Sequence, residues 1–477
     1  MNFERSDTVK KVFWFILTVC LVFMLSSGAF ASEVSYVVKI KDGYVPVDLM
    51  ELLTEVNKDH RLYTASDYKK VSAFEDYIEY IEEDVTFDII DEVVPAETED
   101  FVSLMNVQDT YYSRQWQLTT VKAQYLWEAH ALGDGVNVAV IDSGCNPHTD
   151  LGGALKGGYN VMSGADTSNY TDNHGHGTHV TGIIAAQHNS IGTRGIAPNV
   201  NIYAIKITDS GTNISMTTVA NAILVAVDNF DCKVINMSLA GSNSTTLKNA
   251  VKHAYNKGVI LVGAVGNYGD DDSNYTATKI LYPAGYDEVI GVAATDKDNK
   301  RTSFSQRNNS TFVSAPGYQH YSTSKGGGYS IMSGTSQATP MVSAIAAVML
   351  SIKPDMTLQQ FKKYIEDNAT KIEDAYTGCG IINAEAMIRD VMDDAVGCYI
   401  SPLKEDGVFV YNNFADAIAA RLFTAESDSE GNEVCSSYPL EIAKGEGQFV
   451  EFTPGAGTMY LWSLNLKPLI EPVEYGK

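Results

Sequence analysis

Cysteine is scarce in this chain, and that limits how the fold can be held together. Of the six cysteines in 477 residues, Cys20 lies in an apolar run near the start. The others form an odd and sparse set, which is not a disulfide framework: Cys145, Cys232, Cys379, Cys398 and Cys435. At most one or two bridges are possible, so the fold must rest on a hydrophobic core, for which 45% hydrophobic residues are ample.

Basic residues are also few. The chain has 34 lysines and arginines against 59 aspartates and glutamates, which gives a formal net charge of −25. Such an acidic chain repels nucleic acid and anionic membrane surfaces, so we expect neither as a partner. No stretch after the N-terminal run is long and apolar enough to span a membrane.

The N-terminus has the layout of a secretory signal. Lys10 and Lys11 precede the apolar run VFWFILTVCLVFML, and SSGAFA follows with small residues at Ala29 and Ala31. This order predicts a signal peptide over residues 1–31, cleaved after Ala31, and a secreted protein, either free or associated with the cell surface. The alternative is an uncleaved membrane anchor, because the run approaches spanning length.

A short acidic unit follows, over residues 32–105. Its segments 35–40 (SYVVKI) and 78–87 (IEYIEEDVTF) have the pattern of strands, and 49–56 has that of a helix. The segment PAETED (95–100) predicts an exposed, cleavable linker.

Residues 106–393 alternate between strand-like and helix-like runs. This rhythm predicts an α/β fold with a mostly parallel sheet and helices on both faces. The expected strands are 136–141, 200–207, 234–237, 259–265 and 289–294. The expected helices lie around 180–186, 217–229 and 247–257. In such sheets, sites form at the carboxyl ends of the strands.

The last part of the chain, residues 394–477, has a different sequence pattern. Short strand-like runs are separated by Gly, Asn, Ser and Pro: 407–411, 419–425, 447–452 and 458–463. They predict a small all-β domain, whose role the sequence leaves open between binding, spacing and stabilisation.

Two motifs carry ionisable groups at the ends of expected elements. The strand VAVIDSG (138–144) ends at Asp142, a carboxylate that needs a partner if it is buried, although a simple strand-end turn fits equally. The segment NHGHGTHVTGIIAA gathers His174, His176 and His179 ahead of a helix. Zinc has to be considered, but the segment lacks an HExxH pattern and a nearby Cys or Glu set.

Two further motifs supply a hydroxyl and an amide. SGTSQATP places Ser336 ahead of the apolar run 341–350, and Pro340 is tolerable only in a first helical turn. Ser336 is therefore expected at a helix N-terminus, where a serine is usually a cap. The strand VILVGAVGN ends at Asn267, which could donate to an oxyanion or cap a turn.

Taken in sequence order on an α/β scaffold, Asp142, His176, Asn267 and Ser336 fit a single catalytic site. The order Asp…His…Ser is that of subtilisin, and residues 110–390 clearly resemble the subtilase family of serine peptidases. The motifs that carry the resemblance are VIDSG, HGTHVTG, VINMSLAG and GTSQATP, with GCGIINA (378–384) as a closing one. The resemblance implies a secreted serine endopeptidase made as a zymogen, acting as a monomer on proteins or peptides.

The resemblance also assigns roles to the motif residues. Ser336 would be the nucleophile, His176 the general base and Asp142 the residue that orients the imidazole. Asn267 and the Ser336 amide would form the oxyanion hole. His174 and His179 would then be structural.

In the family, two segments flank the primary specificity pocket. The matching residues here are Ser238, Leu239, Ala240 and Gly241, and Gly263, Ala264 and Val265. The segment 209–212 would pair with substrate as an added strand. Leu281 stands where many subtilases have glycine, which implies a shallower pocket. Residues 270–272, all aspartate, could favour basic substrate residues, although a solvated loop is the simpler reading.

A structural calcium ion is implied in the same way, with no organic cofactor. The segment QHNSIGT (187–193) resembles the calcium loop of the family. The matching ligand positions are Asp109, Asp150, Gln187, Asn189, Ile191 and Thr193. Six or more oxygens suit Ca²⁺, and the alternative is a glycine-containing loop without an ion.

The resemblance extends to the acidic N-terminal unit. YVVKI and YIEYIEED resemble the folding-assistant propeptide of the family, so we expect the chain's own propeptide as a partner, cut between about residues 87 and 108.

Two other functions stay open: a processing peptidase of narrow specificity, and a catalytically silent binding protein. Gln337 is a local departure, because many family members carry methionine after the serine.

Overall fold

The structure, a computed structural model, describes residues 34–89, 109–271, 274–394, 397–400, 407–413, 418–427, 433–442, 447–451, 457–463 and 473–475. The expected signal peptide and the expected linker 95–100 lie outside these residues. The chain forms two compact units, one that ends at Asp84 and one that begins at Val85.

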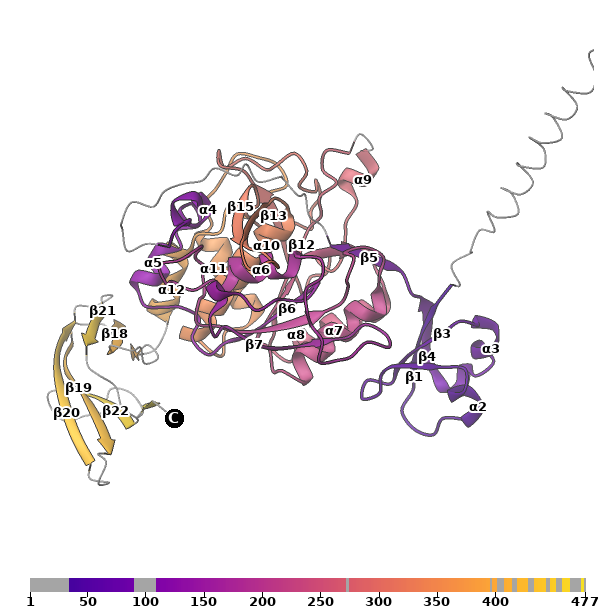
Figure 1. The fold of residues 1–477 in the computed structure, drawn as a ribbon, viewed down its shortest axis with the longest axis horizontal. Helices are drawn as coiled ribbons and strands as arrows, with labels where there is room; N and C mark the ends of the chain where they lie inside the picture. Colours follow the sequence, from indigo (N-terminus) through magenta and orange to yellow (C-terminus); the bar gives the residue numbers. More distant parts are fainter. Residues whose placement is uncertain are drawn as a thin grey trace, which may run out of the picture. The chain divides into compact units, whose positions relative to one another are not determined.

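The first unit is a four-stranded sheet in the order β2-β3-β1-β4 (Figure 1). Its strands are β1 (Tyr36–Ile40), β2 (Thr54–Asn57), β3 (Leu62–Ala65) and β4 (Ile78–Glu83), with helices α2 (Val47–Met50) and α3 (Tyr68–Ser72). The prediction of a helix over 49–56 is wrong. Helix α2 already ends at Met50, and the end of the predicted helix lies in β2, which pairs with β3. The single strand expected over 78–87 is also two: β4 ends at Glu83, and β5 (Thr86–Ile89) joins another sheet.

The second unit is built on a seven-stranded sheet in the order β14-β13-β12-β10-β6-β8-β7, whose neighbouring strands are all parallel. The strands are β6 (Asn137–Asp142), β7 (Leu155–Asn160), β8 (Asn201–Lys206), β10 (Val234–Met237), β12 (Ile260–Ala264), β13 (Ile290–Thr295) and β14 (Val313–Pro316). The five expected strands are all present to within a residue or two. Strands β7 and β14, at the two edges, were not expected.

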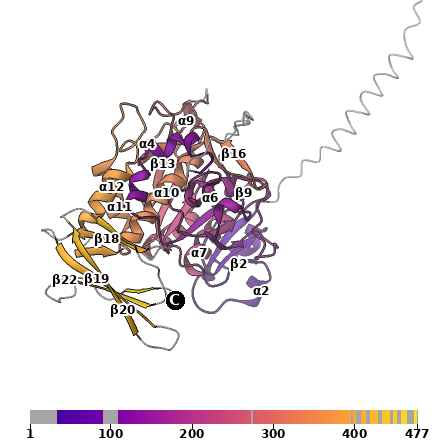
Figure 2. The same cartoon turned by 60° about the vertical axis from the view of Figure 1, so that its left-hand side comes forward.

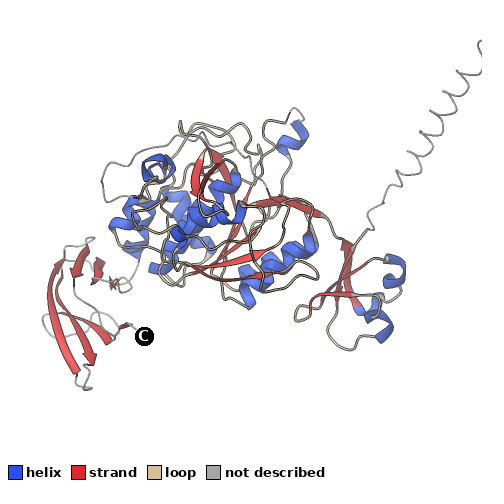
Figure 3. Cartoon of the chain, viewed as in Figure 1, coloured by secondary structure: helices blue, strands red, loops and turns tan. Residues whose placement is uncertain are grey.

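Helices cover the sheet on both sides, as Figure 3 shows in blue against red strands. They are α6 (His176–Ala185), α7 (Met216–Asp228), α8 (Thr245–Asn256), α10 (Thr335–Ile352), α11 (Leu358–Asn368) and α12 (Ala384–Asp394). Helix α7 packs on β6, β8 and α8, whereas α10 packs on the central strands and on α6. Helices α6 and α10 lie side by side in both views (Figures 1 and 2).

Helix α10 is the centre of the core. Among the described residues it is the one helix long and apolar enough to cross a membrane, but nearly all of it is buried inside the protein. Ser336 is its second residue, as expected. Pro340 lies one turn further in than expected, and it has no N–H for the carbonyl of Ser336. The hydroxyl of Ser238 donates to that carbonyl instead, at 2.8 Å.

The described residues of the C-terminal part form strands, in two small antiparallel sheets ordered β17-β18-β21 and β20-β19-β22-β23. The four expected strands correspond to β18 (Gly407–Asn413), β19 (Ile418–Ser427), β21 (Gly447–Glu451) and β22 (Gly457–Ser463). Strands β17 (Gly397–Ile400), β20 (Glu433–Ile442) and β23 (Val473–Tyr475) complete the sheets.

Cysteine contributes no bridge to the described part of the peptidase fold. Cys145, Cys232 and Cys379 are free thiols. Burial raises the pKa of Cys145 to about 12, so this thiol stays protonated and acts as a small apolar side chain. The core therefore carries the fold, as the composition predicts.

Candidate active site

The residues singled out in the sequence meet at one edge of the large sheet. Asp142 ends β6, Asn267 follows the end of β12 by three residues, and His176 begins α6. Ser336 lies in the first turn of α10, which crosses the central strands. Because all these strands are parallel, their carboxyl ends lie together, and the loops that follow them share one site.

Asp142 and His176 form a fully buried pair. The Nδ1 atom of His176 lies 2.9 Å from Oδ1 and 2.8 Å from Oδ2 of Asp142, and both residues are 0% exposed. A carboxylate can only accept, so the proton of this bond is on Nδ1. Nε2 is then the nitrogen that can take a proton from another group.

Ser143 and Asp172 hold this pair in place. The N–H of Ser143 donates to Asp142 Oδ1 at 2.7 Å, and its hydroxyl donates to Asp172 at 2.8 Å while accepting from the N–H of Gly177. Asp172 is 2% exposed and also accepts from the N–H and hydroxyl of Thr178 in the first turn of α6. The sequence analysis missed Ser143 and Asp172, although both lie within the DSG and DNHGHG segments.

Three polar side-chain groups converge around Gly334. A Cβ at this glycine would lie 2.8 Å from Ser336 Oγ, 2.8 Å from Gln337 Oε1 and 2.9 Å from Asn267 Nδ2. The oxygen of the Asn267 side chain accepts from the N–H and the hydroxyl of Thr335, at 2.9 and 2.8 Å. Those bonds fix the amide, so its Nδ2 faces the space beside the hydroxyl of Ser336.

His179 and His320 are buried and neutral. The Nε2 atom of His179 lies 3.1 Å from the carbonyl of His320, and that of His320 lies 2.7 Å from the carbonyl of Pro316. Burial lowers the pKa of His179 to about 3 and that of His320 to about 4. His174 is half-buried, with its ring centroid 6.4 Å from that of His176. These contacts agree with structural roles for His174 and His179.

The strand β5 lies between β11 (Leu239–Gly241) and β9 (Ile214–Ser215) in a three-stranded antiparallel sheet. Leu239 pairs with Ile89, Ala240 with Asp88 and Gly241 with Phe87. Residues 239–241 therefore pair with an extended strand of this chain, and the carbonyl of Gly211 accepts a main-chain hydrogen bond from it.

The base of the expected pocket is apolar. Leu281, Ala240 and Ala264 form one buried cluster, and a Cβ at Gly263 would lie 3.1 Å from Val289. Val265, also buried, packs against Ala284 and Ala293. Leu281 thus occupies the place that the resemblance gave it. Asp270 and Asp271 are exposed, which fits a solvated loop.

The expected calcium ligands lie near one another, but several of their side chains make hydrogen bonds or an ion pair within the protein. Asp150 Oδ2 accepts from the N–H and hydroxyl of Thr193, while its Oδ1 is buried with no hydrogen-bond partner among the described residues. A buried, unpaired carboxylate oxygen suits a cation. Asp109 does not fit as well: Oδ1 accepts from the N–H groups of Asn189 and Ser190, and Oδ2 pairs with Arg194.

The other loop residues also have hydrogen bonds within the protein. The side-chain oxygen of Asn189 accepts from the N–H of Ile191 at 3.0 Å, and the side-chain amide of Gln187 donates to the carbonyls of Ala185 and Pro198. The donor set that fits an ion is therefore Asp150 with the carbonyl-bearing loop 187–193, and Asp109 is better explained by its ion pair.

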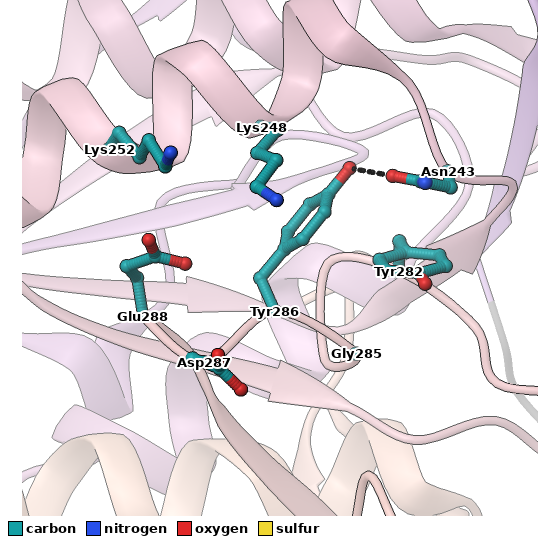
Figure 4. A pocket seen from close by; sticks show the side chains of 8 residues that line it. All are labelled: Asn243, Lys248, Lys252, Tyr282, Gly285, Tyr286, Asp287 and Glu288. Atoms are coloured by element: carbon teal, nitrogen blue, oxygen red, sulfur yellow. Dashed lines mark hydrogen bonds between the residues drawn. The ribbon is translucent and has the colours of Figure 1, made fainter.

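A separate shallow pocket of about 320 Å³ lies between α8 and the loop that follows Tyr282 (Figure 4). Lys248 and Lys252 line one side, and Asp287 and Glu288 line the other. The hydroxyl of Tyr286 donates to Asn243 Oδ1 at 2.8 Å across it. Its charges of opposite sign balance, and it contains none of the residues described above.

This arrangement is that of a serine peptidase built on a parallel sheet. A sequence profile of the subtilase family matches residues 133–383, which is just over half of the chain. The chain therefore belongs to the subtilase family, and it is a serine endopeptidase.

Individual relatives agree with this assignment. The chain is 42% identical over 269 residues to subtilisin DY of Bacillus licheniformis, which covers 56% of this chain and 95% of the relative. It is 40% identical over 272 residues to subtilisin E of Bacillus subtilis (strain 168), covering 56% and 70%. It is 37% identical over 317 residues to the minor extracellular protease Epr of the same strain, covering 65% of this chain and 46% of Epr.

Proposed function

We propose that the chain hydrolyses peptide bonds in proteins through Ser336, His176 and Asp142. The hydroxyl of Ser336 attacks the scissile carbonyl, and Nε2 of His176 takes its proton and returns it to the leaving amine. Asp142 holds the tautomer and stabilises the imidazolium that forms. The observation that carries this proposal is the fully buried pair of Asp142 and His176, 2.8 Å apart, beside helix α10, whose second residue is Ser336.

Asn267 and the N–H of Ser336 supply the oxyanion hole in this proposal. The amide oxygen of Asn267 is held by Thr335, which leaves its N–H₂ group as the end directed at the developing negative charge. The loss of one such donor typically costs about 2.7–4 kcal/mol of transition-state stabilisation.

Substrate binds as an added strand against 238–241 and 209–212. Its specificity side chain enters the pocket bounded by Ala240, Gly263, Ala264 and Val265, where Leu281 limits the depth. The bond geometry supports this: the N–H of Ile89 in β5 donates to the carbonyl of Gly211 at 2.8 Å, as a peptide substrate would.

The same strand supports a zymogen. With β5 seated between β9 and β11, the chain's own N-terminal part occupies the substrate cleft. Ile89 pairs with Leu239, the residue next to Ser238, whose hydroxyl bonds to Ser336. By counting along the sequence from Ile89, we propose that the bond between Ile90 and Asp91 is the one cut. Both of these residues lie outside the described ones.

Secretion and calcium belong to the proposal as well. The N-terminal signal and a relative that is named an extracellular protease support export. Calcium would be held by Asp150 and the loop 187–193, where it would tie two loops together. It would take no part in the chemistry.

A fluorophosphonate probe tests the proposal directly. Mature wild type should be labelled on Ser336, and Ser336→Ala should not be labelled. If wild type stays unlabelled, or if the variant is labelled equally, the chain is a silent binding protein or uses another nucleophile. Profiling with a peptide library then separates a general endopeptidase, which gives many cleavages, from a narrow processing peptidase.

A further inference from the structure

Strand β5 is a peptide bound in the cleft, so its side chains indicate what the cleft accepts. The N–H of Ile89 donates to Gly211, and the N–H of Met216 donates to the carbonyl of Val85, both at 2.8 Å. Between these bonds, Phe87 pairs with both Ile214 and Gly241. The strand is thus held by main-chain bonds at both ends, and its register is fixed.

The side chains of β5 alternate, as in any strand. Phe87 is 1% exposed and Ile89 is 7% exposed. A Cβ at Gly241 would lie 2.4 Å from the ring of Phe87, so the absence of a side chain there makes room for the ring. Asp88 lies between these two residues and opposite Ala240, so its side chain points the other way, toward the rim of the cleft, where it is half-exposed.

Asp88 nevertheless has a defined partner in the cleft. Its Oδ1 accepts from the main-chain N–H of Asn213 at 2.9 Å. Asn213 has a φ of 53°, the left-handed conformation that asparagine tolerates better than most residues. This conformation, between the carbonyl of Gly211 and the strand that starts at Ile214, directs the N–H of Asn213 at the side chain of Asp88.

The charge of this carboxylate also acts on Tyr268. Burial and then the negative charge of Asp88 raise the pKa of Tyr268, so the phenol stays protonated at the rim of the cleft. Asp88 therefore has one defined partner, the main-chain N–H of Asn213, and carries its charge at a half-exposed position.

We propose that Asn213 N–H forms a subsite for a carboxylate on the substrate residue that pairs with Ala240. This inference rests on the proposed function, and with the scissile bond after Ile90 it concerns the third residue before that bond. An aspartate reaches the N–H with the geometry of Asp88. Asparagine offers an oxygen without the charge, alanine offers nothing, and lysine has no acceptor.

A set of internally quenched peptides tests the subsite. The parent peptide copies residues 85–92, so that it contains the bond between Ile90 and Asp91, and its third residue before the cut is varied among Asp, Asn, Ala and Lys. With mature wild type, kcat/KM for Asp should exceed that for Asn by about two- to tenfold, the range expected for one hydrogen bond at a half-exposed site. Equal rates for Asp, Asn and Ala would overturn the proposal.

Two variants locate the effect at Asn213. Asn213→Pro removes the N–H, together with the left-handed conformation that proline cannot adopt, and should bring the Asp-to-Asn ratio to about one. Asn213→Gly keeps both the N–H and the left-handed conformation and should keep the ratio. Because each ratio compares two substrates of the same variant, differences between variants in the amount of folded enzyme cancel. A retained ratio in Asn213→Pro would overturn the proposal.

An internal control and a separate readout complete the design. The preference for Phe over Leu at the position of Phe87 should persist in both variants, because Gly241 is unchanged. Failure of the proposed function gives a different result: no peptide is cleaved and the fluorophosphonate does not label. Cleavage without a preference for aspartate contradicts the subsite alone.

Discussion

The side-chain amide of Gln337 bonds to both His176 and Ser336. Its Nε2 lies 3.3 Å from Nε2 of His176, and its Oε1 lies 3.2 Å from the hydroxyl oxygen of Ser336. Because Nδ1 of His176 carries the proton that Asp142 accepts, Nε2 accepts the amide N–H, and the hydroxyl donates to the amide oxygen. Gln337 is 0% exposed and contacts both residues, so a change at this position should affect the proposed base and the proposed nucleophile.

Oxidation is the first property that this contact affects. Methionine at this position would be converted to a polar sulfoxide beside the nucleophile, whereas glutamine does not react. We expect wild type to keep most of its activity in peroxide that inactivates Gln337→Met. Residual activity against time, with the mass of the peptide that contains residue 337, measures this.

Gln337→Leu is the matched control, because leucine removes the amide but cannot be oxidised. It should resist peroxide as wild type does, whatever its starting activity. Faster inactivation of wild type than of Gln337→Met would show that oxidation elsewhere decides the outcome.

Gly334 should tolerate no side chain. A Cβ there would meet Ser336 Oγ, Gln337 Oε1 and Asn267 Nδ2 at 2.8–2.9 Å, although the backbone is extended and suits any residue. We expect Gly334→Ala to fold but to lose about 100-fold or more in kcat/KM, the scale of losing an oxyanion donor. Gly326→Ala is the control, since its Cβ would meet nothing within 4 Å. Equal activity of both variants would contradict the crowding.

The proposed propeptide cut can be tested from the termini of the mature protein. If β5 marks the substrate register, intact-mass and N-terminal peptide analysis should find a chain that begins at Asp91, and Ser336→Ala should keep residues 32–90 attached. A first cut elsewhere between 87 and 108 would show that the register of β5 is not that of the cleaved form. Wild type and Ser336→Ala are expressed from full-length genes that differ only at position 336, so their termini can be compared directly.

Chelation tests the calcium part of the proposal. An ion that binds only the folded state raises the melting temperature, so EDTA should lower it in the inactive Ser336→Ala protein. Asp150→Asn, which neutralises the carboxylate whose Oδ1 is buried without a hydrogen-bond partner among the described residues, should start lower and respond less. Asp109→Asn should also lower the melting temperature, through its ion pair with Arg194, yet keep the response to EDTA. A melting temperature that EDTA leaves unchanged would contradict the proposed calcium site.

The sequence predicts the peptidase fold well where its signals are local and apolar. Strand β10 was expected over its full length. The partnership of Asp142 and His176 was implied by the family resemblance, and the two side chains lie 2.8 Å apart. The edge strands β7 and β14 were missed, since β7 (LKGGYN) lacks an apolar run and β14 (VSAP) is very short.

Other features depend on contacts that no local pattern carries. Pro340 fits inside α10 because Ser238, about a hundred positions away, satisfies the carbonyl that a residue with an N–H would have bound. Arg194 pairs with Asp109 across 85 positions, which changes the expected ligand set. Resemblance alone cannot give such compensations, because each depends on one residue particular to this chain.

Acid should destabilise the fold through its buried histidines. The pKa values of His179 and His320 are lowered by burial to about 3 and about 4, against 6.5 for an exposed histidine. Below pH 6.5 the unfolded chain binds protons that the folded chain refuses, so the free energy of unfolding falls as pH falls toward about 4. Each histidine should contribute a loss of about 1.4 kcal/mol per pH unit in that window.

Urea unfolding of Ser336→Ala at pH 7, 6 and 5 measures this slope without autolysis. His320→Asn keeps a donor for the carbonyl of Pro316 and removes one titrating group, so the slope should become shallower by about one proton, even if the variant is less stable at pH 7. His253→Asn, at a partly exposed position on α8, is the surface control and should stay closer to the parent. A slope unchanged by His320→Asn would mean that this imidazole is protonated in the folded protein as easily as in the unfolded chain.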